Sequence, residues 1–266
     1  MKVKKRLDVL LTEQGYADTR SKAQAIIMSG QVYVNGQKAD KPGVSYEETV
    51  ELEVRGAVCP YVSRGGLKLD KAMKTFPITL DGYVCMDIGA SHGGFTDCML
   101  QNGAAKVYAV DVGYGQLDYK LRTDERVINM EKTNARYLEA DSLGEMVDVV
   151  TTDVSFISLD KILPPAMTFL KEGGHVLALI KPQFEAGKEN VGKKGVVRDP
   201  AVHRDVVEKI LALCDEINLT VWGLDFSPVK GPEGNIEYLL WGCKNPDTDF
   251  VPDAAAVVAA AHDRLD

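Results

Sequence analysis

The sequence has few of the residues that build disulfide frameworks or metal centres. It contains five cysteines and four histidines in 266 residues, and no two cysteines form a C-x-x-C pair. An odd number of unpaired cysteines argues against a disulfide framework or a zinc site and fits a reducing cytoplasm. The histidines lie far apart along the chain and indicate no metal cluster, so we expect no bound metal: His92, His175, His203 and His262.

The sequence also lacks a hydrophobic run long enough to cross a membrane. A spanning helix needs about 20 apolar residues, whereas the best run, HVLALI, covers only 175–180 and is typical of a buried strand. Polar residues interrupt the apolar part of the opening MKVKKRLDVLLTEQG, so we expect no signal peptide. These features favour a cytoplasmic protein without a membrane partner.

Positive charge is scarce overall, but the shortage is uneven. The net charge of −8 would argue against a nucleic-acid partner. Residues 1–45, however, hold eight Lys and Arg against four Asp and Glu, so this segment carries +4 and the remainder −12. Such asymmetry favours a local basic surface on an acidic body, although chance in a short window could give the same count.

The first 60 residues predict a small α+β unit. Helical patterns in KRLDVLLTEQG and TRSKAQAIIMSG each end at a glycine, and QVYVNGQKAD contains the tight-turn signal Asn35-Gly36 before a strand pattern at 50–54. This order resembles an S4-type RNA-binding domain. The resemblance implies that basic side chains face RNA phosphates, whereas composition alone favours solvated surface charges: Arg6, Arg20, Lys22 and Lys38. We predict domains at 1–60 and 63–266, with a linker at about 55–62.

Beyond residue 80, strand and helix patterns alternate. Helical patterns occupy 63–76, 94–103, 157–174 and 199–218, and an Ala-rich terminal helix is predicted at 251–266. Apolar runs separated by helices indicate a parallel sheet covered on both faces. The last two strands leave no room for a crossover helix and are predicted to pair antiparallel. The α/β fold is therefore a mostly parallel seven-stranded sheet with an antiparallel last strand, as in Rossmann-like methyltransferases, with strands at 83–89, 106–112, 126–130, 147–154, 175–180, 220–229 and 236–243.

The segment DIGASHGGFTD places a glycine-rich turn after the first strand of this sheet. A dinucleotide fingerprint would need a glycine at position 91, and no G-K-[ST] of a Walker loop follows. Asp111 lies 22 residues after Gly89, close to the roughly 20 expected for a carboxylate that holds ribose hydroxyls. That carboxylate is common to dinucleotide and S-adenosylmethionine sites, so the turn alone leaves both open, together with a purely structural turn.

Four ionisable residues stand where side chains reach the ligand edge of such a sheet. Asp153 and Lys181 end two apolar strands, Glu237 begins the last strand, and Lys68 lies in the helix before the sheet. Each alone would be an ordinary surface charge. As a set beside a glycine turn, they are expected to converge.

The motifs SRGGLKL, DIGASHGGFTD, VDVVTTDVSFISL, LIKPQFE, KGVVRD and SPVKGPEGNIEYL together resemble the TlyA family, which are bacterial ribosomal-RNA ribose 2′-O-methyltransferases also labelled haemolysin A. The resemblance implies a catalytic K-D-K-E tetrad at Lys68, Asp153, Lys181 and Glu237. It also implies an S-adenosylmethionine site, formed by Asp87, Gly89, Ala90, Ser91, Gly93, Gly94, Phe95, Asp111, Val112 and Asp153. Its expected substrate is a cytidine ribose in ribosomal RNA or a ribosomal subunit. One departure is CPYV at 59–62, where relatives often have R-x-W-V.

The expected chemistry is removal of a ribose hydroxyl proton as the methyl group is transferred. A lysine is ordinarily a poor base, but proximity of Lys68 and Lys181 is expected to lower the pKa of one of them. We hypothesise that Lys181 is the general base, that Asp153 orients it, and that Glu237 holds the 2′-hydroxyl or Lys68.

The segment 182–198 is interpreted as a mobile substrate lip or, alternatively, a disordered surface loop. The complete set of RNA-binding candidates is Arg6, Arg20, Lys22, Lys38, Arg64, Lys188, Lys193, Lys194 and Arg198. The competing functions are a membrane-active haemolysin, an RNA-binding protein with an inactive methyltransferase fold, and a dinucleotide oxidoreductase. No obligate protein partner is indicated.

Overall fold

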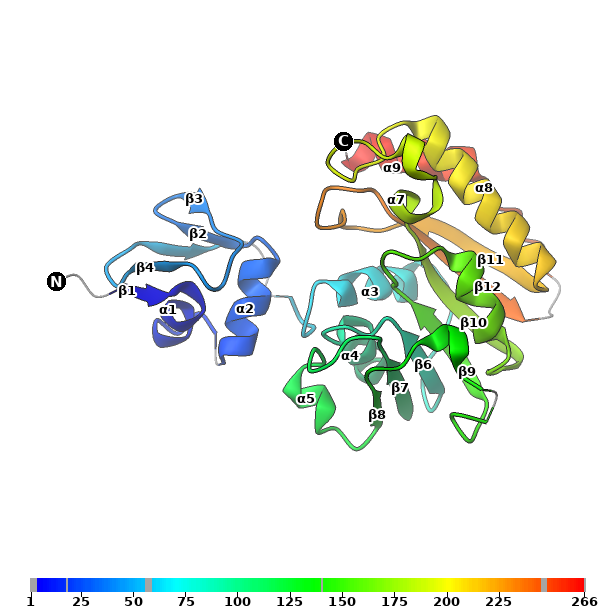
Figure 1. Ribbon diagram of the computed structural model, residues 1–266, viewed down its shortest axis with the longest axis horizontal. Coiled ribbons are helices and arrows are strands. Elements are labelled where there is room, and N and C mark those ends of the chain that lie inside the picture. The colour runs from blue at the N-terminus through cyan, green and yellow to red at the C-terminus, as the bar shows by residue number, and fades with distance from the viewer. Residues whose placement is uncertain (1–3, 18, 56–58, 140, 245–247, 266) are drawn as a thin grey trace. The chain divides into compact units, whose positions relative to one another are not determined.

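The computed structural model describes residues 4–17, 19–55, 59–139, 141–244 and 248–265. The chain divides into two compact units, Met1–Arg64 and Gly65–Asp266, drawn in blue and in cyan to red in Figure 1. Residues 56–58 of the predicted linker and the last residue of the predicted terminal helix lie outside the described residues. Each unit has its own apolar core.

The N-terminal unit combines helices with small antiparallel sheets. Its elements are β1 (Lys4–Arg6), α1 (Leu7–Glu13), α2 (Arg20–Met28), β2 (Val32–Val34), β3 (Gln37–Lys38), β4 (Ser45–Glu47) and β5 (Leu52–Val54). The predicted tight turn is confirmed, because β2 pairs with β3 across Asn35 and Gly36, whose φ angles of 48° and 77° suit such a turn. The pairing of β1 with β4 was not predicted, since such short polar strands carry no hydrophobic alternation.

The second unit contains one mixed seven-stranded sheet in the order β11-β12-β10-β9-β6-β7-β8. The predicted fold class is confirmed: β10, β9, β6, β7 and β8 run parallel, while β12 lies antiparallel between β10 and β11. The strands are β6 (Val84–Ile88), β7 (Lys106–Val110), β8 (Val127–Met130), β9 (Val147–Thr152), β10 (Leu170–Ile180), β11 (Leu219–Phe226) and β12 (Tyr238–Lys244).

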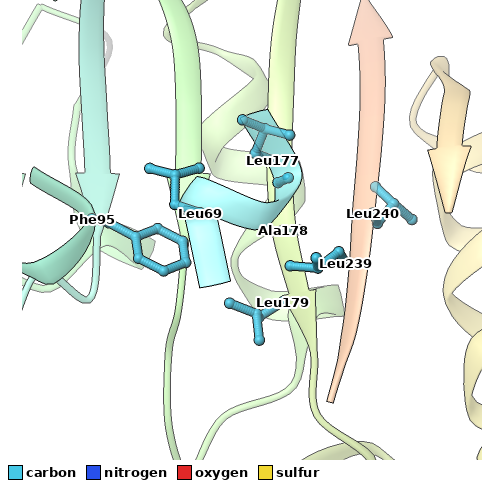
Figure 2. Close-up of a pocket in the computed structure, with 8 residues that line it drawn as sticks. Leu69, Phe95, Leu177, Ala178, Leu179, Leu239 and Leu240 are labelled. Carbon is cyan, nitrogen blue, oxygen red and sulfur yellow. The ribbon is translucent and has the colours of Figure 1, made fainter. Parts of the chain in front are cut away.

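Helices cover both faces of this sheet, which is why its central strands are apolar on both sides. One face is covered by α6 (Leu163–Met167), α8 (Pro200–Glu216) and α9 (Ala254–Leu265). Their buried side chains pack with alternate residues of β10, including Val176 and Ile180, in the apolar core of this unit. On the other face lie α3 (Gly65–Thr75) and α4 (Gly94–Gln101). Figure 2 shows a small apolar pocket between these helices and β10 and β12, lined by Leu69, Ala72, Phe95, Leu177, Ala178, Leu179, Leu239 and Leu240.

The predicted helix at 157–174 is wrong in its second half. A 3₁₀ turn, η2 (Leu159–Lys161), and the short α6 occupy the first half, but Leu170 already begins β10. The Gly173-Gly174 pair allows the strand to shift register before His175, and Gly173 adopts a φ of 73°. The helical spacing of the apolar residues was therefore a weaker signal than the glycines.

Two short helices follow strand ends and were not predicted. They are α5 (Tyr119–Arg122) and α7 (Pro182–Glu185), with further 3₁₀ turns η1 (Ala135–Tyr137) and η3 (Lys188–Asn190). The segment 182–198 thus begins with helical turns. Among the described residues, no helix is both long and apolar enough to span a bilayer.

Candidate active site

The four ionisable residues of the expected tetrad lie together at the carboxyl edge of the parallel strands. Asp153 directly follows β9, and Lys181 directly follows β10. Glu237 directly precedes β12, which runs the opposite way and therefore starts at the same edge. Lys68 lies in the first turn of α3. The next residue of this helix, Leu69, is buried and lines the apolar pocket between α3 and the strands β10 and β12 (Figure 2).

The four side chains form a line of alternating charge. Lys68 Nζ lies 2.7 Å from Glu237 Oε2 and 3.1 Å from Asp153 Oδ2. Lys181 Nζ lies 2.5 Å from Asp153 Oδ1. Lys68, Lys181 and Glu237 are buried, and Asp153 is half-buried. Because isolated buried charges are costly, each charge of this line depends on its neighbours.

The two lysines differ in the number of carboxylates that they meet. Burial alone would lower the pKa of Lys68, but the Asp153 and Glu237 carboxylates outweigh burial and hold that pKa above its ordinary value. This is opposite to the shift expected from a second lysine nearby, so Lys68 stays an ammonium. Burial would raise the pKa of Asp153, yet Lys68 and then Lys181 hold it below its ordinary value. Asp153 is therefore ionised.

The glycine turn lies directly beside this line of charges. Gly89 and Gly93 have φ angles of 86° and 93°, which residues other than glycine rarely adopt. A Cβ atom on Gly89 would lie 3.1 Å from the backbone oxygen of Asp153. The turn leads into α4, whose N-cap is Gly93, and Gly94 and Phe95 of the predicted set are buried in the first turn of that helix.

Asp111 fixes the shape of this turn. Its two carboxylate oxygens accept hydrogen bonds from the backbone N–H groups of Ser91, at 2.8 Å, and Gly113, at 2.7 Å. Each oxygen keeps a lone pair for a ribose hydroxyl. The next side chain, Val112, is 70% exposed and offers an apolar surface for a ring. These residues and the wide turn with Ala90 fit S-adenosylmethionine.

Asp87 lies beneath the turn rather than at the open edge. Its carboxyl is fully buried and accepts hydrogen bonds from Thr96 Oγ1, at 2.6 Å, and Thr151 Oγ1, at 3.1 Å. Burial outweighs these donors and raises the pKa of Asp87 to about 7. These contacts support the turn from below.

Three side chains near the tetrad in space or in sequence were not predicted: two contact it directly, and the third follows Asp153 by three residues. Lys181 Nζ donates to Ser155 Oγ at 3.3 Å, and Gln183 Nε2 lies 3.4 Å from Glu237 Oε1. Phe156 is 91% exposed, has a φ of 63°, and tilts against Phe184 with ring centroids 5.1 Å apart. A bulky residue with positive φ and an exposed ring is uncommon, and the motif SFISL next to Asp153 was its available signal.

The basic candidates for RNA contact lie in both units. In the N-terminal unit, Arg6 and Arg20 share the buried carboxylate of Asp8, Lys22 and Lys38 are exposed, and Arg64, the last residue of that unit, is half-buried. The candidates of the segment 182–198 are all exposed: Lys188, Lys193, Lys194 and Arg198.

Comparison with known proteins gives matches over almost the whole chain. Residues 61–244 match the family model of FtsJ-like methyltransferases, and residues 5–50 match the S4 domain. YqxC of Bacillus subtilis is 51% identical over 98% of this chain and 95% of its own. The Mycobacterium tuberculosis protein named 16S/23S rRNA (cytidine-2′-O)-methyltransferase TlyA is 41% identical over 97% and 96%. A solved structure from Streptococcus thermophilus is 46% identical, with a TM-score of 0.79, over 99% of this chain and 98% of that one.

Proposed function

The chain belongs to the TlyA family of FtsJ-like methyltransferases, and from that premise we propose that it methylates the 2′-hydroxyl of a cytidine ribose in ribosomal RNA. The methyl donor is S-adenosylmethionine. The observation that carries the proposal is the line of alternating charge, directly beside the Gly89 turn, that is formed by Glu237, Lys68, Asp153 and Lys181.

S-adenosylmethionine supplies an electrophilic methyl group on a cationic sulfur, so the chemistry needs no covalent enzyme intermediate. The work left to the protein is alignment of the ribose and removal of one proton. Asp111 and the Gly89 turn would hold the donor. The methyl group would go to the 2′-oxygen with the sulfur as leaving group, and the hydroxyl proton would pass to a side-chain base.

We assign that base to Lys181, which has to be in its neutral amine form to accept the proton. Lys68 is held as an ammonium by two carboxylates and cannot accept a proton. Among the described residues, Lys181 contacts one carboxylate, that of Asp153, and Ser155 Oγ, which together orient its Nζ. Glu237, through Lys68, keeps the opposite end of the line in place.

Features around the tetrad support an RNA substrate. The exposed ring of Phe156 offers a surface on which an unpaired base can stack, and proteins commonly recognise single-stranded RNA by such stacking. The exposed lysines of the segment 182–198 can contact phosphates. The N-terminal unit adds an S4 domain, and one relative of its sequence is a small ribosomal subunit protein uS4, 40% identical over 53 residues. We therefore propose that this unit docks ribosomal RNA for the catalytic unit.

Replacing the proposed base tests the assignment. For Lys181→Ala we expect methyl transfer to ribosomal RNA to fall by about 10²–10⁴-fold, the usual contribution of a general base, while S-adenosylmethionine binding remains. The readout is mass mapping of ribose methylation together with calorimetric titration of the methyl donor. Lys161→Ala, which removes an exposed lysine of η2, is the control. Near-normal turnover of a folded Lys181→Ala protein would refute the role of Lys181.

A titration separates this proposal from an RNA-binding protein with an inactive fold. A catalytic site must bind S-adenosylmethionine, whereas an inactive one need not. Absence of measurable binding by the wild-type protein would reject the proposed activity.

A further inference from the structure

The N-terminal unit contains a fully buried carboxylate that joins three of its elements. Asp8, in the first turn of α1, is 0% exposed. It accepts hydrogen bonds from Arg6, which ends β1, and from Arg20 and Gln24, which lie one turn apart on α2. The Arg6 guanidinium, with Gln24 and Arg20, holds the pKa of Asp8 far below its ordinary range. Asp8 is therefore a permanent buried charge.

The two arginines meet at a single oxygen atom of this carboxylate. Arg6 binds the Asp8 carboxylate in a bidentate manner: Nε donates to Oδ1 at 3.0 Å, and NH2 donates to Oδ2 at 2.9 Å. Arg20 NH2 donates to the same Oδ2 at 3.0 Å. This arrangement brings two like charges side by side, which would be unfavourable without Asp8 between them.

The arginines nevertheless remain open to solvent on their other edges. The side chain of Arg6 is 48% exposed and that of Arg20 is 56% exposed. Arg6 lies over Gly43, where a Cβ atom would be 3.7 Å from NH1. The contacts with Asp8 use Nε and NH2 of Arg6 and NH2 of Arg20. Within the part of the chain that the structure describes, NH1 of Arg6 and both Nε and NH1 of Arg20 are left to donate elsewhere.

We propose that Asp8 is a positioning residue that assembles Arg6 and Arg20 into one binding site for a phosphate group of the RNA backbone. Two guanidinium groups against one carboxylate leave a net positive charge, and an anion placed between their free edges balances it. Guanidinium groups bind phosphate best through paired, fixed N–H donors. Holding both side chains before RNA arrives removes part of the ordering cost of binding.

The inference rests on the proposed function, because ribosomal RNA is the phosphate-bearing substrate of that reaction. It makes a prediction opposite in sign to simple electrostatics. Removing an acidic charge from an RNA-binding surface ordinarily strengthens attraction to a polyanion. Removing Asp8 is instead expected to weaken RNA binding, since the two arginines lose their common anchor.

The experiment measures methylation of ribosomal RNA by full-length Asp8→Asn protein. We expect KM for RNA to rise about tenfold, with kcat and the affinity for S-adenosylmethionine within twofold of wild type. The matched control is Glu53→Gln, which removes the carboxylate paired with Arg55 in the same unit; that carboxylate is 51% exposed. The control is expected to bind RNA as tightly as wild type or more tightly.

Two further variants separate positioning from a merely structural role. In an Arg6→Gln/Arg20→Gln background, Asp8→Asn should cause no additional loss of RNA affinity, whereas a structural role would weaken binding again. Arg6→Lys/Arg20→Lys keeps both positive charges but removes the paired N–H donors of the guanidinium groups. This variant should weaken RNA binding about as much as Asp8→Asn. The lysine variant carries the test if Asp8→Asn does not fold, since both arginine side chains are solvent-exposed.

The outcomes distinguish this inference from the proposed function. If wild-type protein does not methylate ribosomal RNA, the proposed function fails. If it does, but Asp8→Asn leaves KM unchanged, or the lysine pair binds RNA as well as the arginine pair, the positioning role of Asp8 is overturned.

Discussion

At the scale of single residues, the catalytic unit buries carboxyl groups in two different ways. Asp153 is paired with two lysines and stays charged. Asp87 accepts hydrogen bonds from the hydroxyl groups of Thr96 and Thr151 and from the backbone N–H of Thr96, none of which is a cation, and its pKa rises to about 7. Burial without a neighbouring cation disfavours the ionised form of a carboxyl group and raises its pKa, so protonation of that group is linked to folding.

The linkage at Asp87 predicts how stability depends on pH. Because the folded-state pKa is raised above the ordinary value of 3.8, the contribution of Asp87 to stability is complete below about pH 4 and is lost as the pH rises to about 7. Asp87→Asn, which cannot ionise, should flatten the fall in stability between pH 5 and pH 8, by up to a few kcal/mol. Urea unfolding at both pH values measures it.

A carboxyl with the opposite shift provides the control for this measurement. Arg126 holds the pKa of Asp124 low, at about 2, so Asp124→Asn should leave the slope between pH 5 and pH 8 unchanged. An Asp87→Asn protein with the same slope as wild type would show that Asp87 does not titrate in this range.

The convergence of the residues at strand ends was predictable, whereas the pairing of Asp8 in the N-terminal unit was not. Asp153 and Lys181 end apolar strands, so strand direction alone puts them at one edge of the sheet. The pairing of Asp8 with Arg6 and Arg20, by contrast, depends on how β1, α1 and α2 pack. The shift of the Lys68 pKa also depended on three-dimensional contacts, because Glu237 is distant in sequence.

At the scale of elements, the glycine turn between β6 and α4 joins the proposed S-adenosylmethionine site to the tetrad. Gly89 approaches the backbone of Asp153, while a Cβ atom on Gly93 would clash with Leu121. Glycine is needed at Gly89 both for its φ angle and for the close approach. These two requirements can be separated by comparison with another glycine.

Gly89→Ala and Gly82→Ala form that comparison. Both positions have positive φ, 86° and 74°, but nothing lies within 4 Å of a Cβ atom on Gly82. Each variant should lose about 1 kcal/mol of stability from backbone strain. Gly89→Ala alone should lose affinity for S-adenosylmethionine, by about tenfold or more, because its Cβ displaces the backbone beside Asp153. Calorimetric titration and thermal unfolding measure these effects, and equal affinities in the two variants would contradict the role of close approach.

The helices and strands were predictable where the spacing of apolar residues agreed with the residues that begin or end an element. The central strands are apolar runs bounded by glycine or charge, and α8 begins after Asp199, whose side chain caps it. The helix predicted at 157–174 failed because its apolar spacing served two elements, α6 and the start of β10. Only the sheet partner of Leu170, which is Val147, decides that it is a strand.

At the scale of the whole molecule, charge and core are divided between the two units. The basic segment 1–45 belongs to the unit that contains the S4 match, and the acidic remainder includes the tetrad. Each unit has its own apolar core, built on residues such as Leu10 and Ile26 in one and Val176 and Ile210 in the other. The charge imbalance indicated a basic segment from composition, whereas the predicted boundary near residue 60 came from the order of the helix and strand patterns.

Separate cores and separate charges predict that RNA docking and donor binding can be uncoupled. A protein of residues 61–266, which starts where the FtsJ-like match begins, should keep its affinity for S-adenosylmethionine within about twofold, because the Gly89 turn and Asp111 lie wholly in the second unit. Its affinity for ribosomal RNA should fall about 100-fold or more, since the deleted segment holds the concentrated positive charge that neutralises phosphates. Filter binding of RNA at two salt concentrations and calorimetric titration of the donor measure both quantities, with the full chain as reference. Undiminished RNA affinity in the shortened protein would mean that the acidic unit docks RNA by itself, through groups such as the exposed lysines of the segment 182–198.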